Sequence, residues 1–472
     1  MIRSNVMRPK GVMDVKTFIK KRTRATAAAS FILLFALAAC SGGGGKPSQI
    51  QIGESGNPGS ETTIQAPTKT GKTTLVFSTF FPDNRLQELV NQYEALHPEV
   101  EIQLQAVQTD DAHLEAEMEK YLTQTNTAML AGKGPDLLVL DDLPAASYVK
   151  NGLLVNFDEL IAQDSTFKKA DYFSNILDNA KIGGGLYAMP TSFFLHGLAG
   201  DEEALAKAGV EINDQSWSWN DFAVLSQQLI NQTYPHVIRT EPQYMLNWMV
   251  SDNLSLFVDE PKGTAKFNTA SFTGLMKQVQ DMSEDGVIGL EGIPYFFPVQ
   301  INSPADYFES LKSYLSPNMK LYVKPHAQDG GTGGNFQPYR SIGLNASSKA
   351  KEQAWDFVKF MISDQVPVEP NHAGFPLNKQ LYAQEIQQLK KEGSVQTAKE
   401  GPLKGVPIKV DPDELDALEQ VLTGATHLVS KFQPDQLAEI ITEQSKAFFS
   451  GQKSAEAVAD LIQNKVTTYL NE

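Results

Sequence analysis

Seven aromatic residues lie beside prolines and glycines or at the ends of predicted strands, away from helical stripes. Binding residues concentrate at such positions, because a rigid scaffold holds the loops that carry them. Flat rings can cover the C–H faces of a sugar, while carboxylates and hydroxyls bind its hydroxyl groups. We therefore predict that these rings and three polar residues bind a solute. The candidates are Phe80, Phe81, Asp83, Asp141, Thr191, Trp248, Tyr295, Phe296, Phe336 and Tyr339.

Each candidate also has a structural interpretation that the sequence leaves open. Any of the rings can pack in a core instead of binding a ligand, and Asp83 can cap the helix that begins near Leu86. Asp141 and Asp142 can cap a helix ahead of Ala145, or they can act as the acids of a surface glycoside hydrolase or lyase. The chain carries no His-Glu-x-x-His or Gly-x-Ser-x-Gly motif and no histidine pair at metal-ligand spacing. We therefore expect no enzyme, no metal and no cofactor.

The candidates at 80–83 and 141 depend on the elements that precede them. Short apolar runs at 75–77, 100–106 and 137–140 predict strands, and the helical stripes at 86–93 and 114–129 lie between them. This βαβαβ order predicts parallel strands with right-handed crossovers. In such sheets ligands bind beyond the carboxyl ends of the strands, where these candidates lie.

The second half of the chain predicts further α/β structure. Ser218–Asp221 resembles a capping box, and a long helix is expected at 271–285. A strand at 342–345 precedes a helix that Ser347 or Ser348 can cap, with its buried face over 354–361. Residues after Asp411 predict three amphipathic helices.

The N-terminal residues predict export. A basic run leads into 15 uncharged residues at 25–39, which is shorter than the ~20 residues that a membrane-spanning helix needs. The run ends in Leu37-Ala38-Ala39-Cys40, which resembles a bacterial lipobox, and Cys40 is the single cysteine of the chain. We expect a signal peptide at 1–39, a lipidated Cys40, and a flexible tether rich in glycine, serine and proline at 40–72.

Charge argues against some partners. Eight of the 40 Lys and Arg residues and one of the 56 Asp and Glu residues lie in 1–39, so the remainder has 32 basic and 55 acidic residues, a net of −23. Such a surface repels nucleic acid and anionic lipid, so we expect no nucleic-acid partner and attachment to the membrane through the lipid alone.

Several segments occur in the order of a known family. They are 134–136, 148–154, 185–190, 216–222, and 342–348 followed by 354–360. Over most of residues 73–472 the chain resembles the family 1 extracellular solute-binding proteins, which include maltose-binding protein and many sugar-binding lipoproteins of Gram-positive bacteria. It lacks the Phe-x-x-Gly-Lys-x-Ala-Met segment usual in that family, which leaves the ligand class open.

The resemblance implies a two-lobed α/β fold like that of periplasmic binding proteins. Each lobe would be a mostly parallel sheet flanked by helices, and a hinge would join the lobes. We expect lobe 1 at 73–190 and 321–362, and lobe 2 at 191–320 and 363–472. Crossings between them would lie near Tyr187–Ser192, Leu321–Pro325 and Ser363.

The implied function is solute capture for an ABC importer at the outer face of the membrane. A sugar or oligosaccharide would bind between the lobes of a monomer, and permease subunits would be the partners. Two alternatives stay open at this point: a surface polysaccharide-degrading enzyme, and a surface interaction or sensory protein that has lost transport.

Overall fold

The computed structural model describes residues 71–231, 234–313, 318–327, 332–367, 373–397, 404–429 and 436–471. The chain divides into two units, Met1–Ala66 and Pro67–Glu472, and the described residues belong to the second. The predicted signal peptide, Cys40 and nearly all of the tether lie outside the described residues. Within them, every helix is too short or too polar to cross a bilayer.

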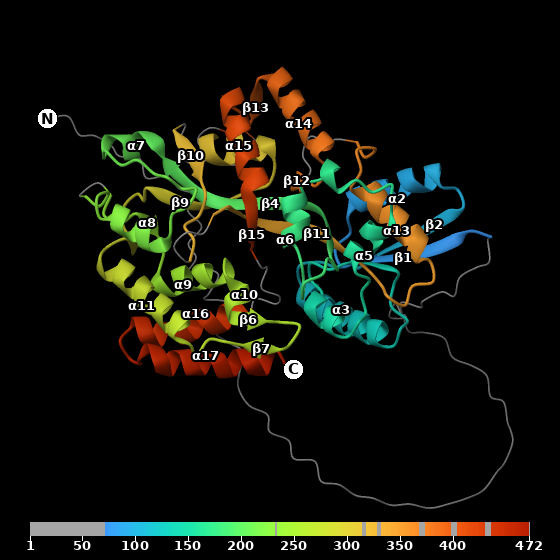
Figure 1. Ribbon diagram of the computed structural model, residues 1–472, viewed down its shortest axis with the longest axis horizontal. Coiled ribbons are helices and arrows are strands. Elements are labelled where there is room, and N and C mark those ends of the chain that lie inside the picture. The colour runs from blue at the N-terminus through green and yellow to red at the C-terminus, as the bar shows by residue number, and fades with distance from the viewer. Residues whose placement is uncertain are drawn as a thin grey trace, which may run out of the picture. The chain divides into compact units, whose positions relative to one another are not determined.

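The predicted βαβαβ order is confirmed at one end of the main sheet. Strands β1 (Thr73–Thr79), β2 (Val100–Ala106) and β3 (Leu137–Val139) are parallel, and helices α2 (Asn84–Leu96) and α3 (Leu114–Leu130) connect them (Figure 1). Alternating apolar residues set the register, so that Leu75 pairs with Ile102 and Phe77 with Leu137. Asp83 caps α2 by accepting the backbone N–H groups of Arg85 and Leu86.

Long antiparallel strands form the middle of the sheet. Strand β4 (Met189–Asp201) pairs with β11 (Gly334–Leu344) on one side and with β9 (Phe296–Ile301) on the other. Beyond β9, β5 (Ile238–Arg239) and β8 (Ile288–Gly289) continue the sheet in parallel. The order is β2-β1-β3-β11-β4-β9-β5-β8. Strands β10 (Met319–Tyr322) and β12 (Phe375–Pro376) also pair with β4, and β15 (Ala425–Leu428) pairs with β11.

Helices and short strands complete the described chain. The helices are α4 (Ala145–Lys150), α5 (Phe157–Gln163), η1 (Lys169–Asp171), α6 (Ser174–Asn179), α7 (Glu202–Lys207), α8 (Trp219–Ser226), α9 (Pro242–Ser251), α10 (Leu254–Phe257), α11 (Ala270–Glu284), α12 (Pro304–Phe308), η2 (Glu309–Ser313), α13 (Lys351–Met361), α14 (Lys379–Glu392), α15 (Pro412–Gly424), α16 (Gln436–Phe449) and α17 (Ala455–Tyr469). Strands β6 (Val258–Asp259) and β7 (Thr264–Ala265) form a hairpin, and β13 (Ser394–Gln396) pairs antiparallel with β14 (Pro407–Lys409).

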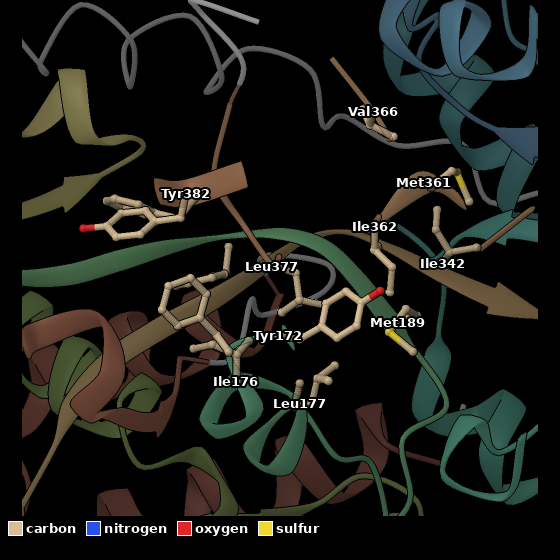
Figure 2. Packing of buried hydrophobic residues seen from close by; sticks show 14 of the residues in the cluster. Tyr172, Ile176, Leu177, Met189, Ile342, Met361, Ile362, Val366, Leu377 and Tyr382 are labelled. Atoms are coloured by element: carbon tan, nitrogen blue, oxygen red, sulfur yellow. The ribbon is translucent and has the colours of Figure 1, made fainter. Parts of the chain in front are cut away.

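The first hydrophobic core lies around β1, β4, β11 and α13. Phe77, Phe193 and Phe357 are fully buried in it, and residues from 375–395 and 410–425 also contribute to it. Figure 2 shows part of this packing, including Tyr172, Ile176, Leu177, Met189, Ile342, Met361, Ile362, Val366, Leu377 and Tyr382. A smaller cluster, with Phe80 and Tyr121, fills the space between α3 and the sheet.

The second core lies where α9, α11, α16 and α17 pack together, well away from β1 and β2 (Figure 1). Apolar residues at helical spacing bury Phe272, Met276 and Val279 of α11 against it. The capping-box prediction is confirmed, because Ser218 and Asp221 bond to each other's backbone at the start of α8.

The predicted α/β fold class is therefore confirmed, with one refinement. The strand pairs at both ends of the sheet are parallel, as predicted. In the middle of the sheet, β4 pairs antiparallel with β11 and with β9. Strand β4 contributes to both cores, since Phe193 and Ala199 pack in the first and Leu198 in the second. The predicted lobe boundaries stay a prediction.

Candidate binding site

A cavity of about 790 Å³ is lined by residues associated with both cores. One wall comes from residues that follow β3 and from the segment 180–188, which leads into β4. The opposite wall comes from α10, from the β6–β7 hairpin and from the C-terminal end of α17. Gln337, Pro338 and Ser341 of β11 also line it. The polar lining residues are Asn126, Asp141, Ser147, Lys181, Ser255, Asp259, Glu260, Lys266, Gln337, Ser341 and Tyr469.

Asp141 holds the first wall to β11. Its Oδ2 accepts the backbone N–H of Arg340 at 2.8 Å, and its Oδ1 accepts that of Ser341 at 3.1 Å. Arg340 has a φ of 49°, the one positive φ of a non-glycine residue in the described chain, so these bonds stabilise an unfavourable backbone. The Arg340 guanidinium lies 2.6 Å from Asp83. The carboxyl ends of β1 and β3 are thereby joined to one point on β11.

Two neighbouring carboxylates lie on the second wall, and only one of them forms an ion pair within the described residues. Lys262 lies 2.6 Å from Asp259, whereas no described residue donates a hydrogen bond to the Glu260 carboxylate or forms an ion pair with it. Desolvation raises the pKa of Glu260. Burial also raises the pKa of Tyr469 to about 12, and the nearby charge of Glu260 adds to this shift. This wall therefore offers an unpaired carboxylate to the cavity.

A buried polar cluster adjoins the cavity. Lys324 Nζ lies 2.9 Å and 3.0 Å from the two carboxylate oxygens of Asp252, and its ammonium lies 4.7 Å from the ring centroid of Trp248. Burial lowers the pKa of Lys324 and raises that of Asp252, while their mutual attraction opposes both shifts. Leu254 and Ser255 line the cavity just after Asp252. The ion pair thus fixes Asp252, and the cavity-lining residues Leu254 and Ser255 follow directly after it.

Histidines extend this cluster toward the cavity. His326 is 8% exposed, its ring centroid lies 4.8 Å from that of His427, and its Nε2 has no hydrogen-bond partner within the described structure. His196 Nε2 lies 3.0 Å from Oε1 of Gln337, which lines the cavity. Burial lowers the pKa of both His196 and His326 to about 4, assisted by Lys324 at the first and by His427 at the second. Both rings are therefore neutral at pH 7.

Four of the predicted rings are buried in hydrophobic clusters. Tyr295 and Phe296 pack in the second core, Phe336 in the first, and Phe80 in the smaller cluster beside Tyr121. The hydroxyl of Tyr295 accepts a hydrogen bond from Asn231 at 3.2 Å. These four rings therefore pack in hydrophobic cores, as the structural interpretation of each ring proposed, and do not line the cavity.

The other predicted residues lie nearer the surface. Phe81 is 50% exposed and packs edge-on against Phe80, and Tyr339 lies against Phe194 and the Arg340 guanidinium. Thr191 donates to the carbonyl of Tyr339 at 3.5 Å. Of the ten candidates, Asp141 lines the cavity, and Trp248 belongs to the adjoining polar cluster.

The residues of the second wall were not predicted from the sequence. Glu260 and Lys266 lie in a charged, Pro/Gly-containing segment that is indistinguishable in sequence from a solvated turn. Tyr469 ends a regular amphipathic helix, whose pattern indicates packing. For a metal, the described residues offer no suitable group of three or more His, Cys, Asp or Glu side chains.

Comparisons with known proteins agree with this fold. The sugar-binding protein MalE from Xanthomonas citri superposes with a TM-score of 0.59 at 16% identity, over 84% of this chain and 98% of that one. A periplasmic oligogalacturonide-binding protein from Yersinia enterocolitica gives 0.56 at 16%, over 84% and 99%. An ABC substrate-binding protein from Listeria monocytogenes in complex with cycloalternan gives 0.51 at 16%, over 85% and 99%. At such identities the likeness concerns the fold.

The family follows from the sequence match. A family model described as bacterial extracellular solute-binding protein matches residues 83–366, which is more than half of the chain. The predicted resemblance is thereby confirmed, and the family is one of binding proteins rather than enzymes. The chain belongs to the bacterial extracellular solute-binding proteins.

Proposed function

We propose that this protein is a lipid-anchored component of an ABC importer that captures a sugar or oligosaccharide in the cavity lined by Asp141 and Glu260. The observation that carries the proposal is the cavity itself. Its volume of about 790 Å³ lies within the ~300–1,000 Å³ typical of small-molecule sites, and both cores contribute to its lining. The sugar-binding relatives of the same fold support this choice of solute.

A thermal-shift screen of the full chain with neutral, acidic and amino oligosaccharides tests the proposal. A solute at one hundred times its Kd stabilises the folded state by about 2.7 kcal/mol. For a domain of this size the melting temperature then rises by about 3 °C. No shift with any sugar class, together with isolation of a stable protein partner, would favour the interaction or sensory alternative.

We propose that the two cores are the interiors of two lobes that close over the solute. Strand β10 lies beside both cores, because the neighbouring residues Leu321 and Tyr322 point to opposite faces and pack in the first and second core respectively. We place a crossing at its end, within Leu321–Pro325. Helices α14 and α15 contribute to the first core, and α16 and α17 contribute to the second, so we assign α14 and α15 to the first lobe and α16 and α17 to the second. Small-angle scattering tests this hinge, because bound solute would reduce the radius of gyration, and an unchanged radius would argue for rigid lobes.

Anchoring through Cys40 has a separate test. Mass spectrometry of the purified protein from its membrane fraction is expected to find acyl chains on an N-terminal Cys40. The variant Cys40→Ala is expected to lose the lipid and leave the membrane. Recovery of both proteins in the membrane fraction would contradict a lipid anchor at this residue.

A further inference from the structure

The β6–β7 hairpin reaches across to the opposite wall of the cavity. A Cβ atom placed on Gly183 would lie 3.7 Å from Cγ of Pro261, so the proline ring sits directly over this glycine. Gly183 and Gly184 have φ values of +59° and +90°, and Ile182 pairs with Gly185 on either side of them. The glycine turn and Pro261 therefore lie close together, and a side chain longer than a methyl group at 183 would press on the proline ring.

Hydrogen bonds attach the β6–β7 hairpin to the C-terminal helix α17, which packs in the second core. Asn471 donates to the carbonyl of Gly263 at 3.0 Å, and Gln463 donates to that of Ala265 at 3.1 Å. Gln463 also accepts the N–H of Phe267 at 2.7 Å. These bonds fix the hairpin to α17, so a movement of the second core relative to the first would carry Glu260 and Pro261 with it.

Glu260 is the residue of this hairpin that is suited to bind solute. It lines the cavity, its side chain is exposed, and no described residue pairs with its carboxylate. The carboxylate can accept about four hydrogen bonds, and the described side chains leave these to water or to a solute. A bound solute can supply the donor.

The cavity's charges favour a neutral donor over a cation. Asp141, Asp259 and Glu260 contribute three negative charges to the lining, and Lys181 and Lys266 contribute two positive charges. The two signs nearly cancel, so the lining has no strong field to select a polycation or a polyanion. A sugar's adjacent hydroxyls can donate to both oxygens of one carboxylate without adding charge.

We propose that Glu260 determines specificity by accepting hydrogen bonds from the hydroxyls of a neutral sugar, and that the contact between Pro261 and Gly183 clasps the cavity around it. This inference rests on the proposed function. It adds the residue that recognises the solute, the solute's charge class, and the contact that retains it.

The recognition step is tested by calorimetry on the full chain with maltotriose, galactotriose, the glucosamine trisaccharide and trigalacturonate as probes. Glu260→Ala is expected to weaken binding of the neutral probe that binds best by at least tenfold, and Glu260→Gln by less, because the amide keeps one acceptor oxygen. Glu284→Gln, an exposed site on α11, is the matched control and is expected to bind as the wild type does.

Each outcome of that experiment is decisive. Equal affinities of Glu260→Ala and the wild type for a neutral probe would overturn the role of Glu260 while leaving the proposed function intact. Tenfold tighter binding of the glucosamine trisaccharide or trigalacturonate than of either neutral probe would overturn the charge class. No binding of any probe by the wild type would count against both the inference and the proposed function.

Two glycine variants test the clasp separately. Gly183→Leu and Gly184→Leu both place a side chain at a positive φ, of +59° and +90°. A Cβ at 183 would lie next to Pro261, whereas a Cβ at 184 has no atom within 4 Å. Gly183→Leu is expected to release a bound neutral probe at least five times faster than Gly184→Leu in stopped-flow measurements. Equal release rates, with both variants folded by circular dichroism, would overturn the clasp.

Discussion

The ammonium of Lys324 bonds to both carboxylate oxygens of Asp252 at 2.9 Å and 3.0 Å, and both side chains are almost fully buried. The pair joins the segment after β10 to the end of α9. Two desolvated charges are tolerated there because each satisfies the other, and the face of Trp248 receives the ammonium as well.

Breaking this pair is expected to be far more costly than replacing it. Lys324→Met alone leaves Asp252 buried without its partner and is expected to lower the free energy of unfolding by about 3–5 kcal/mol. The double variant Lys324→Met/Asp252→Leu removes both charges and is expected to recover most of that loss. Urea unfolding at pH 7.5 measures both, and equal losses in the single and double variants would contradict the ion-pair explanation.

The buried histidines predict a loss of stability in mild acid. The pKa of His326 falls from 6.5 to about 4 on folding, so below pH 6.5 the unfolded state binds the proton that the folded state excludes. Stability is fully present above pH 6.5 and declines toward pH 4, by up to about 3 kcal/mol for this residue. His196, which has the same direction of shift, adds to the decline.

His326→Gln tests this prediction, because glutamine does not titrate. Chemical unfolding of the wild type and the variant at pH 7.5, 5.5 and 4.5 is expected to show the smaller decline in the variant. Lys324, Asp252 and His427 face the same cluster, so their charges remain in both proteins. Parallel pH profiles would show that His326 does not titrate as described.

Gly197 of β4 marks a close approach between strands. A Cβ atom there would lie 2.6 Å from Leu321 Cδ1 and 2.8 Å from the carbonyl oxygen of Tyr322. Gly197→Ala is therefore expected to lower the unfolding free energy by about 1–3 kcal/mol through overpacking. Gly274→Ala on α11 is the control, since no atom lies within 4 Å of its Cβ, and it is expected to stabilise the helix by about 0.5–1 kcal/mol. Destabilisation of both by the same amount would refute the steric argument.

Asp141 is expected to be a structural acceptor rather than a catalytic acid. Asp141→Ala leaves the N–H groups of Arg340 and Ser341 without the acceptor they now share, and is expected to cost about 1–3 kcal/mol. Asp141→Asn keeps one oxygen and is expected to lose less. Assays for reducing ends released from polysaccharide are expected to show no product with the wild type, and release that Asp141→Asn abolishes would instead support the enzyme alternative.

Local signals in the sequence identified much of the fold. The caps at Asp83 and Ser218 and the apolar stripe of α11 were predictable because neighbouring residues determine them. One local prediction was wrong. Neither Ser347 nor Ser348 occupies the N-cap of α13, which is Ala350, because the hydroxyl of Ser348 bonds to Asp136 while accepting the N–H of Ala350. A distant partner thus changed the role of a capping residue.

The sequence by itself determined the α/β order, the family and which faces of the helices are apolar, because these properties depend on residue type and short-range spacing. Tertiary structure alone decided the cavity. The sequence shows that a ring such as Phe296 or Phe336 is apolar and needs to be shielded from water. It does not show whether other side chains or a bound solute shield it. Pro261 meets Gly183, and Arg340 meets Asp141, only after the crossing strands bring distant segments together, so the walls of the cavity are a product of the fold.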